Sequence, residues 1–219
     1  MHTTDTTLAE LAIEHPAAAR VFLTHGLDFC CKGRRSLTAA CAEKGLDPNG
    51  ILAEIEGAPS TGDLASWSHR PVPELIHHIL TRYHARLRSD LPALIAMADK
   101  VEERHADKPS VPAGLARHLR AVHAAVLDHL AKEESILFPM ILAGRGAMCA
   151  GPIQVMEAEH VDHGENLART RALAGDLVTP PAACTTWRAL YMGLAVLESD
   201  LMEHIHLENN VLFPRVLMA

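Results

Sequence analysis

The sequence has few aromatic residues and no long apolar run. Phe, Trp and Tyr make up only 4% of its 219 residues, and Leu and Ala dominate the hydrophobic 48%, a composition that favours helices over strands. No stretch reaches the roughly 18 consecutive apolar residues typical of a membrane-spanning helix. The formal charge of −7 makes nucleic acid and anionic membrane surfaces poor partners. We therefore expect an all-α protein whose partners include neither nucleic acid nor membrane.

Cysteine is sparse and forms no familiar pattern. Five are present, at Cys30, Cys31, Cys41, Cys149 and Cys184. An odd number without a Cys-x-x-Cys pair argues against a disulfide framework and against a structural zinc site. The N-terminal segment is acidic and lacks the basic and then apolar regions of a secretory signal. The sequence thus predicts a cytoplasmic protein whose thiols stay reduced.

Helix lengths divide the chain into two regions. Residues 1–57 contain four short apolar segments punctuated by Gly and Pro, which indicates a small helical domain. Residues 58–73 are rich in Gly, Pro and Ser, as linkers are. Residues 74–219 hold four long apolar-periodic stretches with short breaks, which predicts an antiparallel four-helix bundle. The stretches run from Pro73 to about Ala106, Pro112 to about Phe138, Pro152 to about Leu177 and Pro181 to about Phe213.

An internal repeat ends the second and fourth stretches. Residues 129–139 read HLAKEESILFP and residues 204–214 read HIHLENNVLFP, so both fit H-x3-E-x4-F-P. A histidine and a glutamate four residues apart lie on one helix face, here within the apolar stripe. A buried glutamate costs several kcal/mol unless it is paired or bound to a metal. The repeat therefore predicts that inward-facing His and Glu side chains bind metal ions.

The other two long helices also carry histidines on or beside their apolar stripes. His84 lies at the edge of the first stripe, and His160 and His163 interrupt the third. The predicted ligands are His84, His129, Glu133, His160, His204 and Glu208. This mixed nitrogen and oxygen set favours iron or manganese, allows zinc, and suits calcium and magnesium poorly. His105 and His163 remain alternatives as extra ligands or as partners of ligands, whereas His206 is expected to face solvent.

The duplicated motif, with single histidines on two further helices, resembles the hemerythrin-like fold. The segment THGLDFCCKGRRSL, residues 24–37, resembles the short domain before that bundle in the Repair of Iron Centres family, the ScdA- or YtfE-type di-iron proteins. The resemblance implies two non-haem irons with an oxo bridge, Glu133 and Glu208 as bridging ligands, and the four histidines as terminal ligands. The further histidine of oxygen-carrying hemerythrins would fall at Gly164, which implies a more open site and argues against oxygen storage.

The resemblance also implies a function in repairing iron–sulfur clusters damaged by nitric oxide (NO) or peroxide. Damaged iron–sulfur proteins would be partners, and NO or O2 small ligands. The leading hypothesis is repair by supplying iron, by reacting with NO, or both. An enzyme that reduces NO to N2O is the first alternative, and a non-enzymatic O2 or NO sensor or carrier the second. The sequence leaves a homodimer open.

The adjacent Cys30 and Cys31 form a second candidate site. The neighbouring Lys32, Arg34 and Arg35 are expected to lower a thiol pKa and favour the thiolate. A thiolate can take up NO, hold iron transiently or exchange disulfides. We therefore predict that this pair assists iron delivery or reduction.

Overall fold

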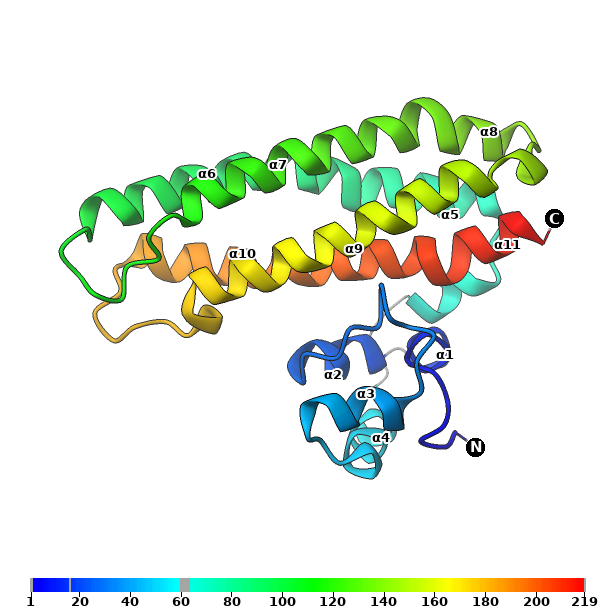
Figure 1. Cartoon of the computed structure of the whole chain (residues 1–219), viewed down its shortest axis with the longest axis horizontal. Coiled ribbons are helices and arrows are strands. Elements are labelled where there is room, and N and C mark those ends of the chain that lie inside the picture. Colours follow the sequence, from blue (N-terminus) through cyan, green and yellow to red (C-terminus); the bar gives the residue numbers. More distant parts are fainter. Residues whose placement is uncertain (1, 16, 60–63, 219) are drawn as a thin grey trace.

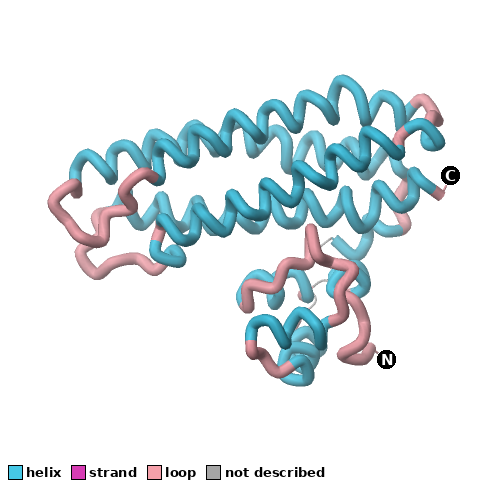
Figure 2. Tube along the Cα trace, viewed as in Figure 1, coloured by secondary structure: helices cyan, strands magenta, loops and turns pink. Residues whose placement is uncertain are grey.

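The computed structural model describes residues 2–15, 17–59 and 64–218. Within these ranges the regular elements are helices, and the one β-type contact is an isolated bridge between Thr7 and Ser36. Figure 1 shows a long antiparallel bundle with a small helical domain against one side, and Figure 2 shows that loops lie mainly at the bundle ends and in the small domain. The all-α prediction is confirmed. No described helix is both long and apolar enough to cross a membrane.

The small domain is built from four short helices. They are α1 (Leu8–Glu14), α2 (Ala18–Thr24), α3 (Leu37–Lys44) and α4 (Pro48–Gly57). Three begin with a capping side chain: Thr7 forms a reciprocal capping box with Glu10, Ser36 caps α3, and Asp47 caps α4. A core of its own, which includes the fully buried Phe22 and Phe29, holds these helices together.

Four helical rods form the bundle. The first joins α5 (Val72–His78), the π-turn η2 (Ile79–His84) and α6 (Ala85–Arg104), and the second joins α7 (Leu115–Lys132), η3 (Glu133–Leu137) and α8 (Phe138–Leu142). The third is α9 (Ala150–Leu173), and the fourth joins α10 (Thr185–His206), η6 (Leu207–Leu212) and α11 (Phe213–Leu217). Within the predicted linker a short 3-10 turn, η1 (Leu64–Ser68), places Trp67 in the bundle core. Residues 60–63 lie outside the described ranges.

Three rods widen into a π-turn where the predicted ligands lie. One π-turn ends at His84, one begins at Glu133 and one contains Glu208. The proline of each F-P pair, Pro139 or Pro214, then stands in the first turn of the resumed α-helix, where a missing N–H costs little. Single π-turns inside α-helices are frequent at functional sites. The F-P of the repeat thus fits a helix that widens and then restarts.

The bundle interior is apolar on both sides of a polar layer. One apolar cluster contains Leu91, Leu130 and Leu201, and the other contains Ile76, Leu137 and Leu212. The six predicted ligands come from positions where the two clusters meet along each rod. The helix packing therefore places polar side chains in a dry interior, where each one needs a partner.

Candidate metal centre

All six predicted ligands meet in this polar layer. His84, His129, Glu133, His160, His204 and Glu208 are each at most 2% exposed. They form two groups in which one donor atom of each side chain lies within 4.8 Å of the others. One group takes His84 and His204, the other takes His129 and His160, and both share the two glutamates. The structure thus brings together every residue of the predicted set.

Each glutamate faces both groups. Glu133 Oε2 lies 3.4 Å from His84 Nε2, and its Oε1 lies 3.4 Å from His129 Nε2. Glu208 Oε1 lies 3.0 Å from His204 Nε2, and its Oε2 lies 3.2 Å from His160 Nε2. One oxygen of each carboxylate therefore points to each half of the site, which is the arrangement of a carboxylate shared by two cations.

Imidazole nitrogens face each other across each half of the site. The Nε2 atoms of His129 and His160 are 3.1 Å apart, and those of His84 and His204 are 3.2 Å apart. His129 Nδ1 lies 2.8 Å from a carboxylate oxygen of Glu159, which can only accept a hydrogen bond. Because Nδ1 carries the proton, Nε2 of the neutral ring presents a lone pair. Two facing lone pairs beside a buried carboxylate suit a cation between them.

The carboxylates control the protonation of the metal-free site. Burial alone would lower the pKa of His129, but the contact with the Glu133 carboxylate at 3.4 Å and the charge of Glu208 outweigh it and raise this pKa to about 9. Burial works against ionised Glu208 too, yet His204 and His160 hold its pKa well below the ordinary value. A metal ion entering at neutral pH must therefore displace a proton from the site.

The hydrogen bonds that the histidine Nδ1 atoms donate follow the sequence repeat only in part. The residue after each shared glutamate orients a histidine: Glu134 accepts from His84 Nδ1 and Asn209 Oδ1 accepts from His160 Nδ1, both at 2.8 Å. Our sequence reasoning missed both, although a polar residue at this place in each repeat was a visible signal. It also missed Glu159, which pairs with Lys132 as well as His129.

The fourth histidine has a different environment. In place of a carboxylate, the ring of Tyr83 stacks on His204 with centroids 5.7 Å apart and 9° between the planes. His204 Nδ1 is buried without a hydrogen-bond partner among the described residues. Each half therefore has one histidine with a carboxylate partner, and the halves differ in the second: His160 is oriented by Asn209, whereas His204 lacks such a partner.

The other candidate histidines lie in three different places. His163 is 3% exposed with its ring edge-on to His129, centroids 4.9 Å apart, so its role as an extra ligand stays a prediction. His105 pairs with Cys184, about 30 Å along the same rod from His84 at 1.5 Å per residue. The prediction that His206 faces solvent is wrong. It is 1% exposed because Phe29 of the small domain covers it.

Buried His206 makes stability depend on pH. Burial lowers its pKa to about 4 from 6.5, although a hydrogen bond to the Phe29 carbonyl acts in the opposite direction. The unfolded chain takes up this proton as pH falls below 6.5 and the folded chain does not until about pH 4, so stability falls between these values, by about 3 kcal/mol. In metal-free protein, urea unfolding measures the free energy of unfolding as a function of pH. For His206→Gln this free energy is expected to fall by about 3 kcal/mol less than for the parent between pH 6.5 and 4. Parallel profiles would contradict it.

The Cys30–Cys31 loop docks directly behind the polar layer. Asn209 Nδ2 donates to the Cys30 carbonyl at 3.1 Å, and the Cys31 thiol donates to the His160 carbonyl at 3.2 Å. Asn209 thus connects the loop to the His160 ring. Gly33 makes the turn possible, because a Cβ there would collide with the carbonyl oxygen of Phe29. This steric limit accounts for the glycine of the Asp-Phe-Cys-Cys-x-Gly segment.

The two thiols and Asp28 form a third group of donor atoms. Cys30 Sγ lies 3.4 Å from both Cys31 Sγ and Asp28 Oδ1, within a group whose donor atoms all lie within 4.8 Å of one another. The predicted thiolate is wrong for Cys30, because its contact with Cys31 and its burial raise the Cys30 pKa. Two of the basic neighbours are paired elsewhere, Arg34 with Glu157 and Arg35 with Glu43.

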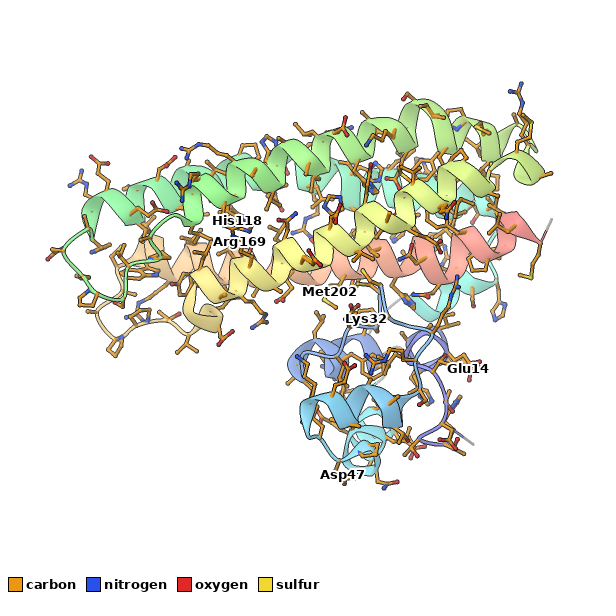
Figure 3. The ribbon with its side chains drawn as sticks, viewed as in Figure 1. Glu14, Lys32, Asp47, His118, Arg169 and Met202 are labelled. Atoms are coloured by element: carbon orange, nitrogen blue, oxygen red, sulfur yellow. The ribbon has the colours of Figure 1, made fainter. Side chains whose placement is uncertain are left out.

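A cavity opens beside the half-buried Cys31. It measures about 470 Å³ and lies between the small domain and the bundle, with Asp28, Cys31, Gly164 and Met202 in its lining. Figure 3 shows Met202 and Lys32 at this junction. Solvent and small molecules can therefore reach the cysteine loop on the side next to α9.

Comparison with known proteins agrees with this architecture. The Hemerythrin HHE cation binding domain model matches residues 75–216, and the ScdA_N model, a domain of unknown function, matches residues 4–58. The chain is 48% identical to the iron–sulfur cluster repair protein YtfE of Citrobacter koseri, Cronobacter sakazakii and Escherichia coli, over 97% of this chain and 96–97% of those proteins. The resemblance drawn from the motifs is confirmed. The chain belongs to the YtfE family of iron–sulfur cluster repair proteins, in which a ScdA_N domain precedes a hemerythrin-type bundle.

Proposed function

We propose that this protein repairs iron–sulfur clusters damaged by nitrosative or oxidative stress, in the cytoplasm, by means of a di-iron centre. Glu133 and Glu208 would be shared by the two irons, and His84, His129, His160 and His204 would hold them as terminal ligands. The observation that carries the proposal is that each buried carboxylate turns one oxygen to each half of the site. The name of the YtfE relatives, iron–sulfur cluster repair protein, supports the repair part of the proposal.

The protein side chains hold and tune such a centre. Bound iron would supply a redox-active Lewis acid that can take a small ligand or be given up. Glu134, Glu159 and Asn209 fix the ring orientations of three histidines. At Gly164, where an oxygen carrier has a further histidine, a Cβ would instead lie 3.7 Å from Cys31 Sγ. Gly164 thus faces the cysteine loop, which favours exchange with that loop over storage of O2.

The cysteine loop is the proposed route for iron leaving the centre. Asp28, Cys30 and Cys31 offer one oxygen and two sulfur donors, next to His160. Cys31→Ser is expected to leave the iron content unchanged and to slow iron transfer to a ferrous chelator by about tenfold, because thiolate is a much better ligand for this purpose than hydroxyl. Stopped-flow absorbance of the chelate measures the rate. Cys41→Ser, in the core of the same domain, is the matched control and should transfer iron at the normal rate.

Cluster repair itself is tested with a purified iron–sulfur enzyme whose cluster has been damaged by NO. Iron-loaded protein, sulfide and a reductant should restore the enzyme's activity, and Glu133→Leu protein should not. An equal amount of free ferrous iron is the reference. Recovery no faster than with free iron would contradict the repair function.

Reduction of NO is the second candidate, favoured by a residue as small as Gly164 at the place where an oxygen carrier has a further histidine. Two NO molecules, two electrons and two protons would give N2O and water. Gas analysis of the iron-loaded protein with NO and excess reductant decides between a reductase and a repair protein. Many N2O per protein would establish a reductase, whereas at most one N2O per di-iron centre fits repair.

A further inference from the structure

A cysteine and a histidine lie in contact at the end of the bundle far from the metal centre. Cys184 is exposed and immediately precedes α10, and His105 immediately follows α6. His105 Nε2 lies 3.2 Å from Cys184 Sγ. Neither residue belongs to a donor group of the metal centre or of the cysteine loop, so this pair is left unexplained by the proposed function.

Neighbouring residues hold the imidazole in place. The His105 ring packs on Trp187, with centroids 5.2 Å apart, and Trp187 is fully buried. Lys108 Nζ donates to the Ala182 carbonyl at 3.2 Å, which ties the segment before Cys184 to the loop after α6. A nucleophile, a base within hydrogen-bonding distance and a group that orients the base are together the signature of an activated nucleophile.

The Cys184 side chain is also free to react. It makes no capping hydrogen bond to α10, although it stands at the N-terminus of this 22-residue helix, where positive potential stabilises a developing anion. Cys30, Cys41 and Cys149 are buried, and Cys31 donates its proton to a carbonyl oxygen. Cys184 thus combines exposure with a base in contact.

We propose that Cys184 and His105 form a thiol–disulfide exchange site, at which Cys184 forms a mixed disulfide with one half of a small disulfide molecule. Cys184 Sγ attacks one sulfur of the disulfide while His105 Nε2 takes the thiol proton. A new sulfur–sulfur bond forms, the old one breaks, and the departing thiolate receives the proton from His105. Cys184 is oxidised and the departing sulfur is reduced, so no further oxidant is needed.

Glutathione disulfide is the probe, added to the folded, full-length protein. Peptide mass spectrometry is expected to find Cys184 modified first among the five cysteines. His105→Gln should slow this modification at least about tenfold, as loss of a general base does. The matched control is Ala182→Cys in a Cys184→Ser background, because position 182 is exposed too and its residue is not the one that contacts His105. This control cysteine should react at the slow rate.

Two outcomes would overturn the proposal. One is an unchanged Cys184 rate in folded His105→Gln protein, and the other is a control cysteine that reacts as fast as Cys184. Circular dichroism checks the fold of each variant. If His105→Gln is poorly folded, the control cysteine decides alone, since that variant keeps His105 and its packing on Trp187. In denaturant, Cys184 of the parent, Cys184 of the His105→Gln variant and the control cysteine should all react at the same rate.

Discussion

Removal of bound iron is expected to lower the free energy of unfolding by about 4 kcal/mol, the stabilisation that a ligand provides at about a thousand times its dissociation constant. The structural reason is that Glu133 and Glu208 are fully buried. Both oxygens of Glu133 and Oε2 of Glu208 have no hydrogen-bond partner among the described residues. Urea unfolding before and after chelation under reducing conditions measures the difference.

The double variant Glu133→Leu, Glu208→Leu is the control for metal removal. Its unfolding should not respond to the chelator, because the shared ligands of both halves are gone. Without metal it should be at least as stable as the metal-free parent, since apolar side chains then replace two buried carboxylates. A parent protein that is equally stable with and without chelator would contradict the assignment of a tightly held metal to this layer.

Asn209→Leu is expected to weaken the binding of one iron about 10- to 100-fold, the usual cost of removing a group that orients a metal ligand. Asn209 is the hydrogen-bond partner of His160 Nδ1 and also holds the Cys30 carbonyl. The iron of the His129–His160 half should therefore be lost first. Competition with a ferrous chelator, followed for both irons, measures the effect.

Asn210→Leu is the matched control, because Asn210 donates to the Phe29 and Cys30 carbonyls and to His206 but contacts no ligand. It should keep both irons and loosen only the docking of the small domain, which limited proteolysis reports. If the two variants lost iron equally, loop docking rather than the orientation of His160 would control the centre.

The sequence was sufficient to predict which six side chains meet in the polar layer, because helix periodicity fixes their positions. An H-x3-E spacing inside an apolar stripe determines both the face and the height of two side chains on one rod. The repeat determines the same for two side chains on a second rod. Single histidines at the same height on the other two rods complete the set. These relations need only the geometry of one helix and an antiparallel order of rods.

The remaining features depend on contacts between distant segments. The burial of His206 follows from the small domain packing on the fourth rod, which no period within the bundle reveals. The link from Cys30 through Asn209 to His160 joins three segments that are far apart in the chain. The raised pKa of Cys30 likewise reflects its burial, whereas the adjacent basic residues had predicted the opposite direction.

Metal content and the visible spectrum of protein purified without added metal test the central claim most directly. They are measured for the parent protein, Glu133→Leu and Glu208→Leu. About two irons per chain, with the absorption of a bridged di-iron centre lost in both variants, is the predicted result. Zinc in place of iron, or unchanged metal content in the variants, would contradict the carboxylate-bridged di-iron centre and the repair function that rests on it.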